Sequence, residues 1–437
     1  MEGEPGRQLG LFDSTCLIVG IIIGVGIYQT APDVARGAGS WWGVLAIWAV
    51  GGLLSLFGAL GYAELASAYP REGGDYVYLT RAYGPWAGFL FGWMQLAIVR
   101  PGDIAVVAFA FAMYTRALYD PFANSGFPYG QQVYAVAAVS VLTAINIIGV
   151  KQGKWAQNVL TVVKVVGLLV IVSVASFASG GSPISAGIEP FPLSIALILV
   201  LFTFGGWNEM AYVAAEVKNA KRNIVRAMVL GTVGVTGVYL LANGAFLHTL
   251  GYAGMASSRA VAADAVSTVF PRLGGRLISA LICISALGVV NGLVFAGARI
   301  SYAVGMEHRT FKVLGRWNPR TGTPIRALMV QAVIATVLIV LLGSFVDTIM
   351  YTAPAVYSFY LATTLAIIVL RRKEPGTDRP YRMMGYPVTT LVFCAVCGFL
   401  VYSAVVYKPW IALGSVGVLL LGLPVYRVSR RKRRRTI

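Results

Sequence analysis

Ile21-Ile-Ile-Gly-Val-Gly-Ile-Tyr28 and Leu201-Phe-Thr-Phe-Gly-Gly-Trp-Asn208 are the two stretches that decide the fold of this chain. Each lies in an apolar run long enough to cross a bilayer, yet each carries two glycines where a membrane helix should be continuous. Glycine is a poor helix former and lets the backbone leave helical geometry. In hydrocarbon, freed backbone groups are tolerated only where they line a cavity, and interrupted helices at matching places in two halves indicate a transporter's binding site. We therefore predict that two membrane helices are broken here and that the chain moves a small solute.

The composition is that of a membrane-embedded chain. Of the 437 residues, 57% are hydrophobic and 12% are charged, and the mean hydropathy is +0.74. A soluble domain carries about 25% charged residues, so this chain does not have the composition of a large soluble globule. We predict an all-α membrane protein.

Apolar runs of spanning length recur about twelve times along the chain. Their approximate ranges are 12–34, 42–69, 86–116, 131–149, 155–178, 193–217, 226–250, 276–305, 324–345, 347–370, 388–406 and 408–427. The two broken segments fall in the first and the sixth run. Spans one to five are therefore predicted to repeat as spans six to ten with inverted topology, followed by two more helices.

The predicted repeats divide the chain into five segments. They are a cytoplasmic N-terminal segment over 1–11, a first five-helix repeat over 12–178, a second inverted five-helix repeat over 193–370, two appended helices over 388–427, and a basic cytoplasmic tail over 428–437.

Positive charge is distributed unevenly between these spans. With an even number of spans and a cytoplasmic N-terminus, most of the 35 Lys and Arg residues fall on the cytoplasmic side, as the positive-inside rule requires. We predict a multi-pass protein of the plasma or inner cell membrane with both termini in the cytoplasm. The net charge of +18 and the basic tail Arg427–Arg435 then favour membrane lipid, and not nucleic acid, as the partner of these residues.

A broken helix offers two kinds of backbone group to a ligand. Its N-terminal end carries partial positive charge and exposed N–H groups, which suit a carboxylate, and its C-terminal end exposes carbonyls, which suit an ammonium. The N–H groups of Gly24, Val25 and Gly26 are candidate donors, and the carbonyls of Ile22, Phe202 and Gly205 are candidate acceptors. A zwitterion fits this arrangement best. The alternative is that the glycines serve only close helix packing.

A longer stretch around the second break resembles a known transporter family. Phe202-Thr-Phe-Gly-Gly-Trp-Asn-Glu-Met-Ala-Tyr-Val-Ala-Ala-Glu-Val-Lys-Asn-Ala-Lys-Arg-Asn223 is similar to the sixth helix and following loop of the amino acid–polyamine–organocation (APC) superfamily. Within it, the chain most resembles the L-type amino acid transporters and their bacterial relatives. The agreement continues in order along the chain, at Tyr62-Ala-Glu64, Pro70-Arg-Glu-Gly-Gly-Asp-Tyr76, Arg100-Pro101, Asn291-Gly292, Arg299, Asp378-Arg-Pro-Tyr-Arg382 and Gly385-Tyr-Pro387. It implies a LeuT-like fold of five plus five inverted helices with two appended, in which helices one and six are broken.

The resemblance also assigns residues of the binding site. The family's carboxylate-binding Gly-Ser-Gly corresponds to Gly24-Val25-Gly26, so Val25 replaces the usual serine and a hydroxyl donor is lost. The family's gating aromatic corresponds to Phe202, and its pocket asparagine to Asn208. The complete set of predicted substrate-binding positions is Ile22, Gly24, Val25, Gly26, Ile27, Phe202, Phe204, Gly205, Gly206 and Asn208.

Lys164 lies deep in the fifth span, within Val159-Leu-Thr-Val-Val-Lys-Val-Val-Gly-Leu-Leu169. A lysine at the centre of a membrane helix costs about 2.5–3.5 kcal/mol on insertion scales, so it normally faces a cavity or a partner. The resemblance places Lys164 where sodium-coupled relatives hold a cation between helices one, five and eight. We predict that its ammonium substitutes for that sodium and contacts exposed carbonyls of the first helix. The alternative is a lysine that snorkels to the membrane surface.

These features together predict a secondary transporter that exchanges α-amino acids, neutral ones above all, by alternating access without sodium. A proton-coupled symporter and a transporter of cationic amino acids or polyamines remain alternatives, the latter if Glu209 faces the pocket. We find no motif of a membrane enzyme, and we expect neither a cofactor nor a metal. The animal L-type transporters bind a heavy chain through a cysteine between helices three and four. The corresponding loop, roughly 117–132, contains no cysteine, so we expect no disulfide-linked heavy chain.

Overall fold

The computed structural model describes residues 9–70, 73–123, 126–148, 154–178, 191–271 and 273–431. Regular structure in these residues is helical, apart from two isolated β-bridges between Leu9 and Val217 and between Asn318 and Thr323. The predictions made for most of the N-terminal segment and for the end of the basic tail concern residues 1–8 and 432–437, which lie outside the described ranges.

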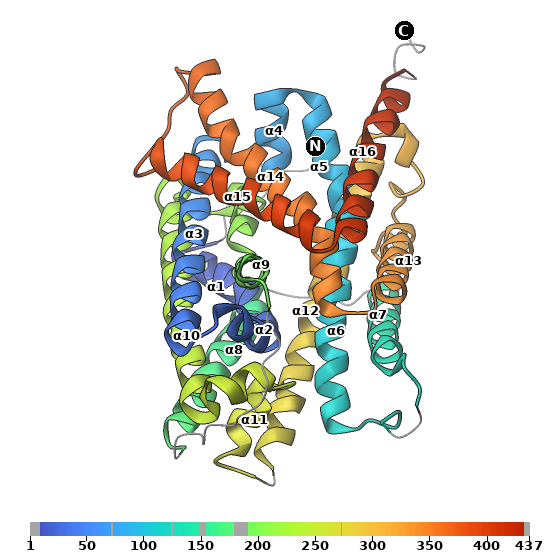
Figure 1. The fold of residues 1–437 in the computed structure, drawn as a ribbon. Coiled ribbons are helices and arrows are strands. Elements are labelled where there is room, and N and C mark those ends of the chain that lie inside the picture. The colour runs from blue at the N-terminus through green and yellow to red at the C-terminus, as the bar shows by residue number, and fades with distance from the viewer. Residues whose placement is uncertain are drawn as a thin grey trace. The chain divides into compact units, whose positions relative to one another are not determined.

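The helices carry the labels of Figure 1. In chain order the α-helices are α1 (Leu11–Ile22), α2 (Gly26–Ala38), α3 (Trp41–Ala68), α4 (Asp75–Tyr83), α5 (Pro85–Met94), α6 (Arg100–Leu118), α7 (Gly130–Ile148), α8 (Lys154–Ser176), α9 (Leu193–Thr203), α10 (Ala220–Ser257), α11 (Val261–Ser267), α12 (Gly274–Glu307), α13 (Ile325–Leu342), α14 (Phe345–Lys373), α15 (Val388–Tyr407) and α16 (Pro409–Arg431). The shorter elements are the π-helix η1 (Gln95–Val99) and the 3-10 helices η2 (Trp207–Ala211), η3 (Ala214–Glu216) and η4 (Arg309–Phe311).

Local sequence signals account for several helix ends. The Ser40 hydroxyl caps α3 by accepting a hydrogen bond from the Gly43 N–H at 3.0 Å, as serine commonly does at this position. Gly39 follows α2 and Gly343 follows α13, both with a φ of 71°. This left-handed conformation is typical of a glycine that ends a helix.

In the described residues, ten helical spans are long and apolar enough to cross a membrane, where α5, η1 and α6 count as one span and α9 with η2 as another, and the bent pair α1 and α2 makes an eleventh candidate. The apolar part of α8 in the described chain, Thr161–Ser176, is shorter. These helices belong to a multi-pass membrane protein, as the composition predicts. The count of twelve spans stays a prediction.

The described chain forms two compact units, and neither is a contiguous half of the sequence. The first contains residues 1–82, 152–278 and 360–400, and the second contains residues 83–151, 279–359 and 401–437. Each unit therefore combines helices from both predicted repeats.

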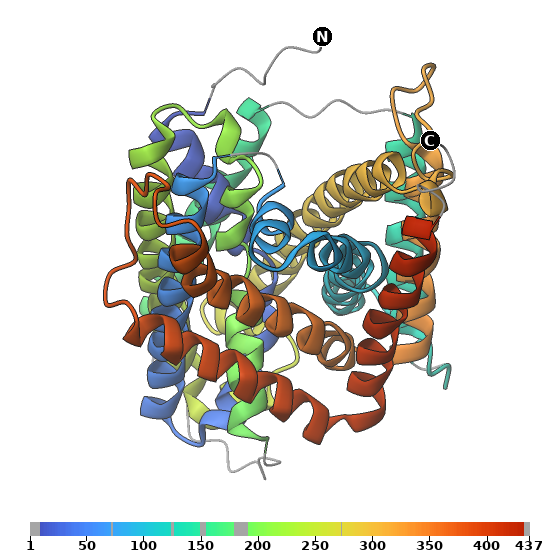
Figure 2. The ribbon, with the colours of Figure 1, turned by 90° about the horizontal axis from the view of Figure 1, so that it is seen from above.

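In the first unit, α3 and α10 run side by side, as Figures 1 and 2 show. Glycines allow the backbones to approach closely. A Cβ on Gly52 of α3 would lie 2.4 Å from Thr236 of α10, and a Cβ on Gly231 of α10 would lie 2.7 Å from Ile18 of α1. Small residues at helix interfaces are the usual means of close packing in membranes, where helix association gains little from hydrophobic burial. Around this pair, α1 also packs against α8, and α2 packs against α9.

In the second unit, α6 packs against α7 and α13, and α16 packs against α5. A Cβ on Gly422 of α16 would lie 2.6 Å from the Trp93 ring of α5, and the Trp93 indole N–H donates to the Val418 carbonyl at 2.7 Å. The predicted site residues all belong to the first unit.

Candidate functional site

The first site element is the interruption between α1 and α2. The two helices are bent by 51° where the chain passes through Ile23, Gly24 and Val25. Ile23 has a φ of −74° and a ψ of 89°, which ends α1. A Cβ built on Gly24 would find no atom within 4 Å, so the backbone at Gly24 borders open space.

The N–H groups at this interruption differ in their availability. The Gly24 N–H donates to the Ile22 carbonyl at 2.9 Å. The first bonds of α2 run from Tyr28 and Gln29 to the Val25 carbonyl, at 3.2 and 3.1 Å. The N–H groups of Gly26 and Ile27 precede these bonds and therefore have no acceptor within α2. They also lie at its positive end, where an anion is favoured.

The second site element follows α9, which ends at Thr203. Gly206 has a φ of 114°, and the 3-10 helix η2 begins at the next residue. A Cβ on Gly206 would lie only 2.4 Å from Cγ2 of Ile21. The two glycine segments, 180 residues apart in sequence, thus pack directly against each other.

Two polar contacts tie the interruptions together. The Thr30 and Thr203 hydroxyls lie 3.1 Å apart. The buried Tyr239 hydroxyl of α10 donates to the Ile22 carbonyl at 2.7 Å and lies 3.4 Å from the Thr203 carbonyl. Tyr239 thus contacts the last residue of α1 and the last residue of α9. Tyr239 is not among the positions predicted from the sequence, because a single tyrosine within an apolar span gives no signal of its own.

Lys164 of α8 contacts the end of α1. Its Nζ donates to the Gly20 carbonyl at 3.3 Å, and one turn earlier the Thr161 hydroxyl donates to the Cys16 carbonyl at 3.2 Å. Gly20 is among the last four residues of α1, whose carbonyls have no partner within the helix. The ammonium therefore lies at the negative end of the α1 dipole, where a cation is stabilised.

The predicted site side chains do not all reach accessible space. Val25 and Ile27 are buried, at 3% and 0% exposure. Phe204 is also buried, with its ring centroid 6.0 Å from that of Trp48 and 5.1 Å from that of Tyr239. Partial exposure is found instead at Gly24, Gly26, Phe202, Gly205 and Gly206. Four of these five residues are glycines, so the groups that solvent reaches at the interruptions are mainly backbone groups.

The predicted acceptors also differ from one another. The Ile22 carbonyl already accepts hydrogen bonds from the Tyr239 hydroxyl and the Gly24 N–H, which uses both of its lone pairs. The Phe202 carbonyl accepts from the Gly205 N–H at 2.9 Å. Asn208 is 8% exposed, and its Oδ1 accepts a hydrogen bond from the Tyr360 hydroxyl at 3.2 Å. The amide nitrogen of Asn208 remains the group with which this side chain would meet a carboxylate.

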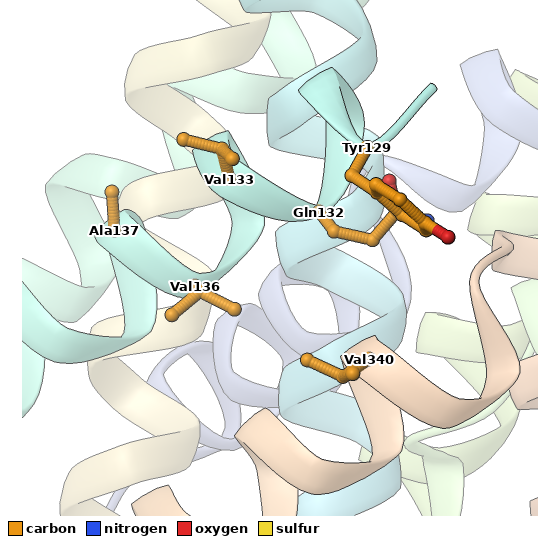
Figure 3. Close-up of a pocket in the computed structure, with 6 residues that line it drawn as sticks. All are labelled: Tyr129, Gln132, Val133, Val136, Ala137 and Val340. Atoms are coloured by element: carbon orange, nitrogen blue, oxygen red, sulfur yellow. The ribbon is translucent and has the colours of Figure 1, made fainter. Parts of the chain in front are cut away.

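A groove in the second unit has a different chemistry. It has a volume of about 420 Å³ and is lined by Tyr129, Gln132, Val133, Val136, Ala137 and Val340, from α7, the residue before it, and α13 (Figure 3). It contains no charged side chain and none of the predicted site residues. Such a lining offers an amino acid's charged groups no oppositely charged partner. Within the described residues, no group of three or more His, Cys, Asp or Glu side chains is placed to hold a metal ion.

The four cysteines, Cys16, Cys283, Cys394 and Cys397, are free and buried. Each lies within a helix, where a buried free cysteine behaves as a small apolar packing residue.

Comparison with known proteins agrees with this architecture. A family model described as amino acid permease matches residues 9–421. The chain is 31% identical to the human b(0,+)-type amino acid transporter 1, over 96% of this chain and 87% of the relative. It is 30% identical to the serine/threonine exchanger SteT of Bacillus subtilis, over 98% of each. It is also 30% identical to the human large neutral amino acids transporter small subunit 2, over 96% of this chain and 80% of the relative.

These matches confirm the resemblance drawn from the sequence motifs, which extends over almost the whole chain. The chain belongs to the amino acid permease family of the APC superfamily.

Proposed function

We propose that this protein exchanges neutral α-amino acids across the cell membrane by alternating access, without sodium. The observation that carries the proposal is the direct packing of the two glycine interruptions, with Lys164 on one of them and Tyr239 on both. The names of the relatives support the cargo and the mode, since one is a serine/threonine exchanger and another a large neutral amino acids transporter subunit. On this proposal the chain is a carrier and not an enzyme.

The substrate carboxylate would bind at the start of α2. The N–H group of Gly26, which is partly exposed, lies ahead of the first intrahelical bonds, and Gly24 leaves open space beside it. The helix dipole adds partial positive charge at the same point. Recognition of this kind uses backbone N–H groups, so it does not require the hydroxyl that is absent at Val25.

The α-amino group would bind to carbonyls at the second interruption. The Ile22 carbonyl is used by Tyr239 and Gly24, so we assign the amino group to the carbonyls of Phe202 and Gly205. Both residues are partly exposed. The half-buried Phe202 side chain offers an apolar surface to a neutral side chain, which favours neutral over cationic cargo.

Lys164 would make transport independent of sodium. Its ammonium donates to the Gly20 carbonyl near the end of α1, where a bound cation would otherwise be stabilised. The Lys164 ammonium would repel a second positive charge at this carbonyl end, which disfavours the binding of sodium there.

We further propose that the chain works without a disulfide-linked heavy chain and that both termini are cytoplasmic. All four cysteines are buried in helices, and the loop between the third and fourth spans contains none. The concentration of Lys and Arg on one side of the predicted spans supports the orientation.

The test is exchange by the purified single chain in liposomes. Uptake of labelled neutral amino acids should be about tenfold faster into liposomes preloaded with the same amino acid than into empty ones, a barrier difference of about 1.4 kcal/mol. Replacing sodium by choline should leave the rate unchanged. Equal uptake into empty and loaded liposomes would exclude exchange, and strong stimulation by sodium would exclude the role of Lys164.

Two variants sharpen the test. Lys164→Ala should slow exchange by at least about tenfold because it leaves the end of α1 without its cation. Lys221→Ala is the matched control, since Lys221 is exposed and pairs with the exposed Asp378 at 2.7 Å. This variant should exchange like the wild type. Amino acid esters and decarboxylated amines should compete poorly, because both lack the negatively charged carboxylate.

A further inference from the structure

Asp75 is a buried acid of the first unit. Its carboxylate accepts hydrogen bonds from side chains of three other segments. Asp75 is the first residue of α4 and is 1% exposed. Its Oδ1 accepts hydrogen bonds from the Tyr62 hydroxyl of α3 and, at 2.7 Å, from the Thr363 hydroxyl of α14. Its Oδ2 accepts from the Tyr212 hydroxyl at 2.8 Å. Tyr212 directly follows η2, the short helix that begins after the second interruption.

The other end of the same short segment is held by aromatic contacts. The Tyr62 ring meets the Trp207 ring edge-to-face, with 5.0 Å between centroids, and Trp207 lies 5.1 Å from the Tyr360 ring. The Tyr360 hydroxyl in turn donates to Oδ1 of Asn208. Segment 207–212 is therefore fixed at Trp207 and Asn208 by Tyr62 and Tyr360, and at Tyr212 by Asp75.

Tyr62 connects the two ends, because its ring packs on Trp207 while its hydroxyl donates to Asp75. The Asp75 carboxylate is thus the common acceptor of the Tyr62, Thr363 and Tyr212 hydroxyls. A buried carboxylate is costly unless it is well hydrogen-bonded, and three hydroxyl donors use only part of its acceptor capacity. Burial raises the pKa of Asp75, as does the nearby charge of Glu209, while the three hydroxyl donors oppose this shift.

We propose that Asp75 is a positioning residue for transport, whose carboxylate fixes segment 207–212 and thereby the orientation of the Asn208 amide toward substrate. Asn208 is one of the substrate-binding positions that the family resemblance predicts, and its contact with substrate rests on the proposed function. The fixing of the segment by Asp75 does not. The two parts therefore have separate tests.

The first test measures the position of the segment without any substrate. Val213→Cys places a thiol beside Tyr212 on a half-buried residue, and the four native cysteines are buried, so maleimide labelling above background reports this site. Adding Asp75→Asn or Tyr212→Phe should raise the labelling rate at least about fivefold, because the segment is released. The double variant should label no faster than Asp75→Asn alone, since both changes weaken the same contact between the Tyr212 hydroxyl and residue 75.

The second test measures transport kinetics. In liposomes, Tyr212→Phe and Asp75→Asn should raise the KM for the amino acid that the wild type exchanges fastest, by at least about fivefold, with turnover changed less than twofold. The matched control is Tyr69→Phe, which removes a hydroxyl that donates to the Glu374 carboxylate at 3.1 Å, away from Asn208. It should change neither the KM nor the labelling.

The outcomes separate the inference from the proposed function. A wild type that exchanges no amino acid refutes the proposed function, and the labelling experiment still decides whether Asp75 fixes the segment. Unchanged labelling and KM in Tyr212→Phe and Asp75→Asn would overturn the inference. A fall in thermal stability with both readouts unchanged would also overturn it, because that result describes a purely structural aspartate. If Asp75→Asn does not fold, Tyr212→Phe decides, since it removes a single hydroxyl.

Discussion

The two interruptions look alike in sequence and differ in structure. Between α1 and α2 the chain bends by 51° with no residue in the left-handed region, since neither Gly24 nor Gly26 has a positive φ. After α9 the chain depends on Gly206, whose φ is 114°. A Cβ at Gly24 would find open space, whereas a Cβ at Gly206 would clash with Ile21.

This difference teaches that a pair of glycines in a membrane helix can serve two separate needs. At the first interruption glycine leaves open space beside the backbone, and on the proposed function this space lets the substrate reach the N–H group of Gly26. At the second interruption glycine is required by the backbone conformation itself, because other residues rarely adopt this region. The first need concerns binding, and the second concerns folding. Four substitutions test this distinction, ordered by their expected effect on stability.

Gly206→Ala should have the largest effect. Forcing alanine into this conformation costs about 1–3 kcal/mol, and the new Cβ would lie 2.4 Å from Ile21. We expect a clear loss of thermal stability in detergent and of exchange in liposomes. The control is Gly234→Ala in α10, where a Cβ would find no atom within 4 Å. A Gly206→Ala protein as stable as the wild type would show that the second interruption does not require glycine.

Tyr239→Phe should have the next largest effect, because it removes the hydroxyl that bonds to the Ile22 carbonyl and lies near the Thr203 carbonyl. We expect a loss of about 0.5–1.5 kcal/mol of unfolding free energy, the net value of a typical hydrogen bond, together with slower exchange. Tyr134→Phe is the matched control, since its exposed hydroxyl donates to the Tyr119 carbonyl at 3.1 Å. Equal losses in the two variants would mean that Tyr239 has no special role in joining the interruptions.

Gly26→Ala should have a smaller effect. Its Cβ would lie 3.1 Å from Oγ1 and 3.2 Å from Cγ2 of Thr203, so the neighbouring threonine must shift by a few tenths of an ångström. We expect a loss below about 1 kcal/mol, measured by thermal unfolding. The double variant with Thr203→Ser removes the Cγ2 methyl group and should recover part of the loss. If the double variant is no more stable than Gly26→Ala alone, the strain that Gly26→Ala introduces lies elsewhere in α2.

Gly24→Ala should have the smallest effect on stability, because its Cβ would meet no atom within 4 Å. Its effect should appear in transport instead, as a rise in the KM for the amino acid. The methyl group would occupy space beside the backbone N–H that is proposed to bind the substrate carboxylate. Thermal unfolding and exchange kinetics measured on the same preparation separate the two effects. A loss of stability equal to that of Gly206→Ala would remove the distinction between the interruptions.

The helices and the site backbone were accessible to sequence reasoning because their signals are local. Helix positions follow from the length of apolar runs, and the described helices begin and end close to the predicted spans, as α3 over Trp41–Ala68 and α7 over Gly130–Ile148 illustrate. The prediction that Gly24, Gly26, Gly205 and Gly206 are site positions follows from the low helix propensity of glycine. Lys164 was noticeable because a charge deep in a membrane span is costly.

Other features depended on contacts between distant parts of the chain. Sequence reasoning included Phe204 and Ile27 among the substrate-binding positions, yet the structure buries both side chains. It assigned the Ile22 carbonyl to the substrate, yet that carbonyl is bonded to Tyr239, 217 residues away. The rotational position of a helix about its axis decides such matters, and near-uniformly apolar membrane helices such as α3 and α9 carry little periodicity to fix it.

The sequence by itself determined that this protein is a polytopic membrane protein of the amino acid permease family, with glycine interruptions in its first and sixth apolar runs. Those properties arise from composition and local backbone preference. Three contacts follow from the tertiary structure alone. Gly206 packs against Ile21, and the Tyr239 hydroxyl bonds to the ends of α1 and α9. The Asp75 carboxylate accepts hydrogen bonds from hydroxyls of three other segments. The physical reason is that hydrogen bonds and close packing require particular atoms within a few ångströms, and the order of residues along one chain does not specify which distant atoms will meet.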